Sequence, residues 1–143
     1  MILDNGFNFT GTGAGQAISG TVAQNSTNVF DAGIAKRLFG GSGARGPRLT
    51  TILSAVGGTT PTFRAQFVGA DDAALTLNVI TIADTGTTRA LVAGDLPLVS
   101  ELQPAEQLDV KRYYGFIFTQ TGTAPTGTVA AQLGESVQSA GLK

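Results

Sequence analysis

Short segments in which apolar and polar residues alternate, each followed by glycine-rich residues, constrain the fold of this chain more than any other feature. The clearest is YYGFIFTQT at 113–121, where Tyr114, Phe116 and Phe118 would share one face of an extended strand. Alternation over aromatic and β-branched residues is typical of a half-buried β-strand. The pattern predicts an all-β protein with this segment as a central strand.

The same pattern recurs along the chain at fairly regular spacing. We predict further strands at 26–31, 48–56, 62–68, 75–83 and 128–133, separated by turns at Gly33, 57–58, 69–72, 84–86 and 122–127. The turn over 122–127 would fold 128–133 back on 113–121 as a hairpin. Residues 31–39 fit either a two-turn helix or a loop, and we detect no internal repeat. Together these features predict a jelly-roll β-sandwich of about eight short antiparallel strands.

The length of 143 residues fits one domain with its own core. We expect residues 1–20 to form a flexible N-terminal arm, residues 21–133 the sandwich and residues 134–143 a C-terminal tail without strand alternation. The first nine residues, MILDNGFNF, have no positive segment and no long apolar core, so no signal peptide is predicted. Apolar stretches are too short for a membrane-spanning helix, and no membrane association is expected.

The absence of cysteine and histidine excludes several kinds of chemistry. Without cysteine the chain has no disulfide, thiolate nucleophile or zinc–cysteine site, and without histidine the commonest general base and metal ligand is missing. The adjacent carboxylates Asp71 and Asp72 would point to opposite faces of a strand or into solvent, rather than face each other across a cleft. We therefore expect no enzymatic activity, no cofactor and no metal, and the net charge of −1 gives no reason to expect nucleic acid.

The sparse charges are distributed unevenly. Charged residues make up 13% of the chain, about half of the usual fraction of roughly 25%. This fits either an ordinary threonine-rich β-protein or a surface that a partner partly covers. Lys36, Arg37, Arg45 and Arg48 fall in one glycine-rich segment without an acidic residue. That basic segment is either a solvated loop or a docking loop for acidic groups of a partner protein.

A glycine-rich run at 11–15, GTGAG, raises the question of phosphate binding. Dinucleotide-binding turns need a buried strand before the glycines and a helix after them. Here the spacing is G-x-G-x-G, the preceding apolar segment is short, and the following QAISGT is β-branched and broken by glycine. The run is better explained as a flexible linker to the first residues.

Several motifs follow one another in an order that resembles a known family. They are MILD at 1–4, STNVFDAG at 26–33, a strand after GPR at 46–48, GADDAA at 69–74 and the long segment LDVKRYYGFIFTQTGTAPTGTVAAQL at 108–133. In this order they resemble the small capsid cement (decoration) proteins of tailed bacteriophages. The resemblance spans residues 1–133, while the glycine-rich run near the N-terminus and the C-terminal tail depart from the family pattern.

The resemblance implies a non-catalytic jelly roll that forms small homo-oligomers, with a dimer favoured over a trimer. It also implies a position on the outer surface of an icosahedral head, where the oligomers bridge major capsid protein subunits. Candidate capsid contacts are Met1, Ile2, Leu3, Phe7 and Phe9, which could add a strand to a neighbouring sheet, and the basic residues Lys36, Arg37, Arg45 and Arg48.

An alternative from another class is a carbohydrate-binding or adhesin-like module of a virion on the same fold. It would use the only clustered aromatic residues, Tyr113, Tyr114 and Phe116, to stack on sugar rings.

Overall fold

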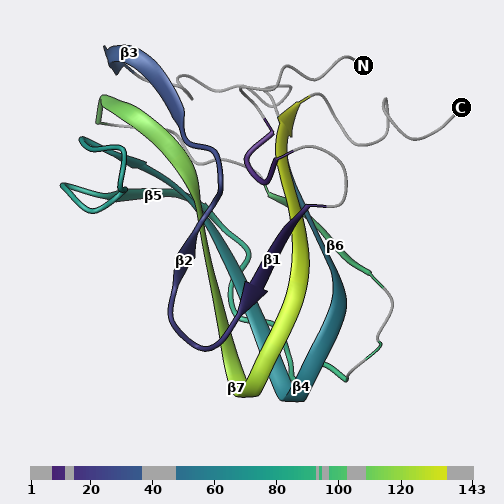
Figure 1. The fold of residues 1–143 in the computed structure, drawn as a ribbon. Helices are drawn as coiled ribbons and strands as arrows, with labels where there is room; N and C mark the ends of the chain where they lie inside the picture. Colours follow the sequence, from purple (N-terminus) through teal and green to yellow (C-terminus); the bar gives the residue numbers. More distant parts are fainter. Residues whose placement is uncertain are drawn as a thin grey trace, which may run out of the picture.

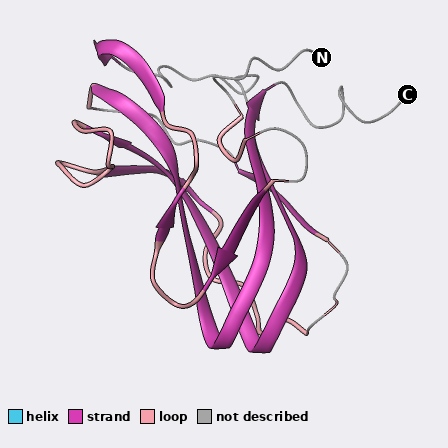
Figure 2. Ribbon diagram, in the orientation of Figure 1, coloured by secondary structure: helices cyan, strands magenta, loops and turns pink. Residues whose placement is uncertain are grey.

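The computed structural model describes residues 8–11, 15–36, 48–92, 94, 97–102 and 109–134. These residues form seven strands and no helix, and all the strands join one antiparallel sheet (Figure 2). The strands are β1 (Gln16–Ser19), β2 (Gln24–Asn25), β3 (Phe30–Lys36), β4 (Arg48–Ala70), β5 (Ile80–Asp84), β6 (Leu98–Leu102) and β7 (Lys111–Gly134).

Two long strands form the backbone of the fold. The 23-residue β4 and the 24-residue β7 pair antiparallel along their whole length, from Arg48 opposite Gly134 to Ala70 opposite Tyr113. Both strands bend at the same level, so this ribbon folds back on itself (Figure 1). We call the bend, residues 57–62 and 121–126, the corner. Arm I is 48–56 with 127–134, arm II is 63–70 with 111–120, and the open end is the end of both arms away from the corner.

The corner is built from two copies of one short motif. The pentapeptide G-T-x-P-T occurs at 58–62 in β4 and at 122–126 in β7, and the two copies face each other across the ladder. The ladder is irregular at three places between Ser54 and Thr62. Proline cannot donate a ladder hydrogen bond, so each copy interrupts the regular pairing.

The two glycines of the motif are required by close packing. Gly58 has φ +98, and a Cβ there would lie 2.6 Å from the carbonyl oxygen of Ala124. Gly122 has φ +113, and its Cβ would lie 2.8 Å from the carbonyl oxygen of Thr59. The third residue of each copy, Thr60 in β4 and Ala124 in β7, has φ 47. This left-handed conformation is costly for residues other than glycine. The corner therefore has approximate two-fold symmetry and is strained on both strands.

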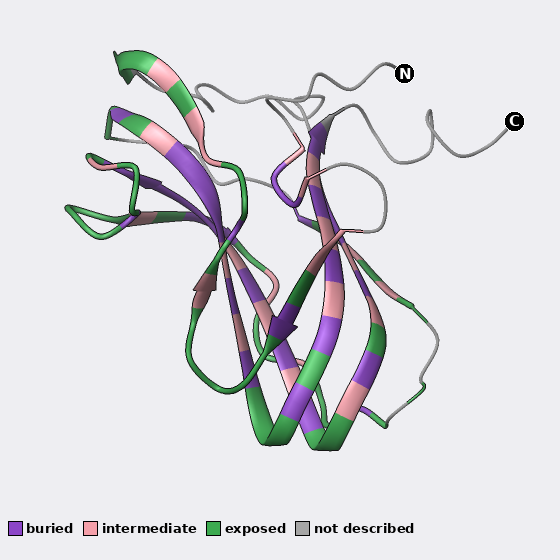
Figure 3. Cartoon of the chain, in the orientation of Figure 1, coloured by how far each residue is buried: buried purple, intermediate pink, exposed green. Residues whose placement is uncertain are grey.

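The core fills the space between the two arms. The buried residues facing it come from both arms: Leu49, Leu53, Val129, Ala131 and Leu133 from arm I, and Phe63, Ala65, Phe67, Tyr114, Phe116 and Phe118 from arm II. Figure 3 shows buried and more exposed residues alternating along both arms. Each large apolar side chain that is fully buried contributes roughly 1.5–3 kcal/mol, so the packing of these faces holds the folded ribbon closed.

Shorter segments cover both edges of the ribbon. Along β7 lie β1, β2 and β3, with the bridge between Asn8 and Gln132 beyond β1. Along β4 lie β5 on arm II and β6 on arm I. Between β5 and β6 the chain stays against β4, because the N–H groups of Thr85, Thr88 and Leu91 donate to carbonyls of β4. The central ladder is thus flanked on each side by a series of short pieces.

The all-β prediction and the alternation within 62–68 and 113–121 are confirmed. Phe63, Ala65 and Phe67 are buried, as are Tyr114 and the two following phenylalanines on its face. The described strands belong to one folded sheet, and a jelly roll of two separate sheets is not seen among them.

Three local predictions are wrong. Residues 122–127 do not close a hairpin, because β7 runs through them while pairing with β4. Residues 57–58 do not end a strand, for the same reason. Residues 31–36 form β3, which is neither the helix nor the loop expected over 31–39. Glycine and proline signalled a change of direction correctly, but the change is a bend of two paired strands.

Two predicted strands and one boundary are also shifted. Residues 75–79 lie in a loop before β5, and 26–29 lie between β2 and β3. The predicted arm over 1–20 does not hold for its described part, because β1 belongs to the sheet and the Asn8 bridge joins it to β7.

Candidate functional site

The open end brings together two segments that the sequence marked as partner contacts. Asn8 is bridged to Gln132, and Arg48 lies opposite Gly134, so the two segments approach neighbouring positions of β7. Lys36 lies opposite Lys111 at the end of arm II. The basic segment therefore starts at the end of one arm and finishes at the end of the other. Met1, Ile2, Leu3, Phe7, Arg37 and Arg45 lie outside the described residues.

Phe9 must be removed from the candidate contacts, because it belongs to the core. Its side chain has no exposed surface. The ring packs edge-on against Phe67 and Phe116, with centroid distances of 5.5 and 5.4 Å. Its N–H donates to the carbonyl of Ala131 at 2.9 Å. Phe9 thus joins arm I through its backbone and arm II through its ring, and the sequence missed this because the segment is too short to show alternation.

The described residues of the glycine-rich run, Gly11 and Gly15, do not form a phosphate-binding loop. Gly15 has φ +93, and a Cβ there would lie 2.6 Å from the carbonyl oxygen of Val129. No helix follows, since β1 begins at Gln16. Residues 12–14 lie outside the described ranges. Glycine is needed at 15 for close contact with β7, which is a structural role.

Exposed apolar side chains gather at the end of arm II. Ile34 of β3 is 70% exposed, Leu77 58%, Val110 50% and Val79 39%. They flank the places where β3 and β4 end and where β7 and β5 begin, at one end of the sheet. We call these four residues the apolar rim. Large exposed apolar patches are typical of protein-binding sites, so these residues are candidates for a contact with a partner.

The loop that carries Leu77 is held rigidly by Asp72. One carboxylate oxygen accepts the N–H groups of Thr76 and Leu77 at 2.7 and 2.8 Å, and the other accepts the Thr76 hydroxyl at 2.6 Å. The hydrogen bond from the Thr76 side chain, followed by that from the Leu77 backbone, lowers the pKa of Asp72. Rigid presentation reduces the entropy that a partner must remove on binding.

A buried leucine also fixes this loop to the sheet. Leu75 is 3% exposed, has φ 58, and packs with Val68 on the outer face of arm II. Gly115 leaves room for it, since a Cβ at 115 would lie 3.0 Å from Leu75 Cδ1. The amide of Asn25 donates to the carbonyl of Ala74 at 2.8 Å. The loop is thus attached to the sheet at several points.

The charged groups beside the apolar rim are paired within the chain. Arg112 donates from Nε and Nη2 to the two carboxylate oxygens of Asp31 at 2.8 and 3.0 Å. This side-chain hydrogen bonding lowers the pKa of Asp31 and raises that of Arg112. Lys111 Nζ lies 3.4 Å from Asp71 Oδ1. A partner surface would meet little unpaired charge at these residues.

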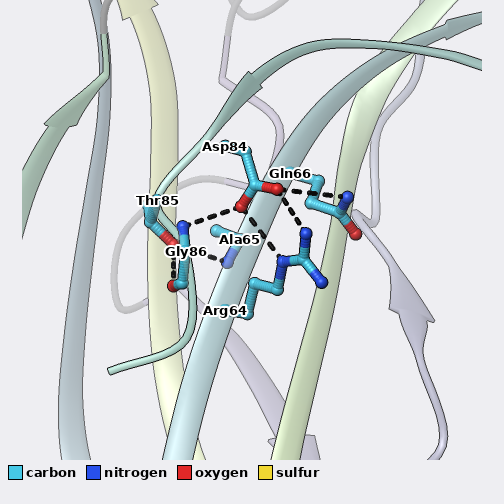
Figure 4. A network of polar contacts seen from close by, with 6 residues as sticks. All are labelled: Arg64, Ala65, Gln66, Asp84, Thr85 and Gly86. Carbon is cyan, nitrogen blue, oxygen red and sulfur yellow. Dashed lines mark hydrogen bonds and ion pairs between the residues drawn. The ribbon is translucent and has the colours of Figure 1, made fainter. Parts of the chain in front are cut away.

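A second polar network lies at the junction of β4 and β5 (Figure 4). Asp84 accepts Arg64 Nε at 3.1 Å and the N–H of Gly86 at 2.7 Å. Hydrogen bonding to Arg64 lowers the pKa of Asp84. The hydroxyl of Thr85 accepts the N–H of Ala65 at 3.0 Å, replacing a ladder carbonyl. This network fixes β5 and the following residues along β4 and has a structural role.

Hydrogen bonds favour the ionised form of four described carboxylates. A general acid at neutral pH needs a carboxyl whose pKa is raised. Instead, hydrogen bonding lowers the pKa of Asp31, Asp71, Asp72 and Asp84. Among the residues that the structure describes, no three His, Cys, Asp or Glu side chains are grouped to hold a metal ion. No helix within the same residues is long and apolar enough to cross a membrane.

The aromatic cluster proposed for sugar stacking is largely inside the protein. Tyr114 and Phe116 have no exposed surface. Tyr113 is half-buried, and the guanidinium of Arg112 lies 5.0 Å from its ring centroid. Stacking on a sugar needs an open ring face, which Tyr114 and Phe116 do not offer.

Comparison with known proteins adds no family assignment: no protein-family model matches the chain, and no curated protein matches it.

Proposed function

We propose that the protein is a capsid cement protein that binds the outside of a phage head and stabilises contacts between major capsid protein subunits. The jelly-roll topology and the homo-oligomeric state, a dimer before a trimer, are parts of this proposal. The observation that carries it is the composition of the open end, where the apolar rim and Lys36 lie at the end of arm II and Asn8 and Arg48 lie at the end of arm I.

The open end combines features that suit a lattice-binding surface. The apolar rim supplies exposed apolar surface, and burying that surface under a partner makes the free energy of binding more favourable. The basic segment between Lys36 and Arg48 supplies charge that orients the approach to acidic groups. Many weakly bound copies on a repeating shell stabilise it through multivalency.

The test is co-sedimentation of the purified chain with empty capsid shells, scored as copies bound per shell. We expect a saturable copy number, with a reduction of about tenfold in affinity for Leu77→Ser, typical of an interface anchor. Val92→Ser is the matched control, because Val92 is 64% exposed but follows Leu91, which bonds to Pro61 at the corner. Deletion of residues 1–7 tests the N-terminal contribution while leaving Phe9 in the core.

Three results would contradict the proposal in different ways. No association with shells would remove the cement function. Loss of binding in Val92→Ser but not in Leu77→Ser would move the contact to the corner end. Binding to a glycan panel without binding to shells would favour the carbohydrate-binding alternative instead.

A further inference from the structure

The segment Asn8 to Thr10 occupies a socket in the sheet as a bound peptide would. It is only three residues long, yet Phe9 and Thr10 are almost completely buried, at 0% and 3% exposed. The Phe9 ring fills a pocket whose walls are Phe67 and Phe116 of arm II. A single aromatic anchor in a deep pocket is a common mode of segment recognition.

Hydrogen bonds hold the same segment along its whole length. Phe9 donates to Ala131, and its carbonyl accepts the N–H of Asn28, both at 2.9 Å. The Asn28 amide donates to the carbonyl of Asn8 at 2.9 Å. The Thr10 hydroxyl accepts the N–H of Ala131 at 3.0 Å. The socket therefore contacts the backbone at Asn8 and Phe9 and the side chains of Phe9 and Thr10.

The connection from this segment to the rest of the sheet is short and rich in glycine. Gly11, Gly13 and Gly15 lie in the sequence between Thr10 and β1, and Gly11 has φ +81 with no atom within 4 Å of its Cβ position. Glycine permits many backbone directions at such a point. Six residue steps from Thr10 to Gln16 can span about 20 Å when extended.

We propose that the socket is an exchange site, and that within an oligomer it takes the Asn8–Thr10 segment of a second copy of this chain. The second copy presents the same three residues, so exchange restores every contact described above, now between two chains. No additional contact is required. Exchange of a terminal segment is a low-cost route to linking copies, because the folded part of each copy stays unchanged. The inference does not depend on capsid binding.

Proximity decides which segment occupies the socket. A segment tethered by a short linker has an effective concentration in the millimolar range, so a dilute chain fills its own socket. When two copies are held within the reach of about 20 Å, the partner's segment competes on equal terms. Exchange should therefore increase with concentration and with assembly.

Paired cysteine substitutions test the inference directly, since the chain has no cysteine of its own. Asn8→Cys with Gln132→Cys places a pair at the bridge beside the socket. Ala17→Cys with Thr128→Cys is the matched control, because these residues pair in β1 and β7 beyond the glycine-rich connection. Both proteins are oxidised across a range of concentrations and run on non-reducing gels, after gel filtration has shown that they fold.

We expect disulfide-linked dimers for the 8/132 pair, with a share that rises several-fold over a tenfold increase in concentration. The control pair should stay linked within single chains. Intramolecular links alone in both proteins, at concentrations where oligomers form, would overturn the proposal. Intermolecular links in both would also overturn it, because β1 would then move with the segment.

A second measurement does not need the cysteines. A protease site is introduced at 12–14, the cleaved protein is purified, and a labelled peptide of residues 1–10 is added. Exchange of the bound segment for this peptide, but not for a peptide with Phe9→Ala, supports the socket. Failure of the unmodified peptide to enter contradicts it.

Discussion

The corner and the open end are the two extremes of one folded ribbon, and they differ in almost every property. The corner is made of glycine, threonine, proline and a single alanine. No charged residue occurs in β4 from 49 to 63 or in β7 from 113 to 134. The open end holds the ion pairs of Asp31 and Asp71 and the apolar rim. One end is specified by backbone geometry and the other by side-chain chemistry. The comparison teaches that the two ends are specified in different ways, and our proposal assigns binding to the open end.

The largest expected effect comes from the residue that joins the arms. Phe9→Ala should lower the free energy of unfolding by about 3–5 kcal/mol, because it removes a fully buried ring between Phe67 and Phe116. Urea denaturation followed by circular dichroism measures this. A change below about 1 kcal/mol would mean that Phe9 does not hold the arms together.

The glycines of the corner should tolerate side chains worse than glycines with positive φ that have open space around the Cβ position. Gly58→Ala is expected to cost about 2–4 kcal/mol, since its Cβ would overlap Ala124 and its φ is +98. Gly20→Ala is the control, with φ +79 but no atom within 4 Å. That variant should cost only about 1–2 kcal/mol from backbone strain. Equal losses in thermal denaturation would show that close packing at the corner is unimportant.

Acid should loosen the open end before the corner. Hydrogen bonds lower the pKa of Asp72 below its ordinary value of 3.8. Because the pKa of Asp72 is lower in the folded protein than in the unfolded chain, its ionised carboxylate stabilises the fold above the unfolded pKa. This contribution is lost as the pH falls through the folded pKa. Protection of the Thr76 and Leu77 amides against hydrogen exchange, relative to the unfolded chain at the same pH, should therefore fall below about pH 4, while protection at the corner changes less. Asp72→Asn should remove this pH dependence, and an unchanged profile in that variant would contradict the assignment.

The smallest effect concerns strain at the corner. Thr60→Gly removes the strain of a threonine in the left-handed conformation, but glycine also makes the unfolded chain more flexible. The free energy of unfolding should therefore rise by at most about 1 kcal/mol. Thr59→Gly relieves no such strain and should be destabilising. Denaturant midpoints of the two variants compare them, and a loss in both would mean that Thr60 makes contacts worth more than its strain.

Local alternation was the most predictable part of this fold. Strand faces at 62–68 and 113–121 depend on neighbours two residues apart, so the sequence reveals them. The corner was not predicted, because glycine and proline give the same signal in a hairpin and in a bend of two paired strands. The repeat of G-T-x-P-T was the available signal, since two similar breaks at opposite positions of paired strands indicate a shared bend.

The candidate site was only partly predictable for a similar reason. The basic segment and the N-terminal residues could be singled out, but their meeting at the open end depends on the pairing of β7 with residues far away in sequence. Leu77 was assigned to a strand because Leu75 to Ala83 is apolar. Asp72 accepts three hydrogen bonds from Thr76 and Leu77 and holds these residues in a loop instead.

The short strands along both edges of the ribbon affect how readily one chain can pair with another. A long, flat edge strand invites another chain to pair with it, and proteins commonly prevent this with charge. This chain has little charge to use. Its described edge strands are at most the seven residues of β3, and the hydroxyls of Thr85 and Thr88 occupy places that a ladder carbonyl would take. Interrupted edges offer few consecutive backbone groups to another chain, so we expect them to resist fibre formation.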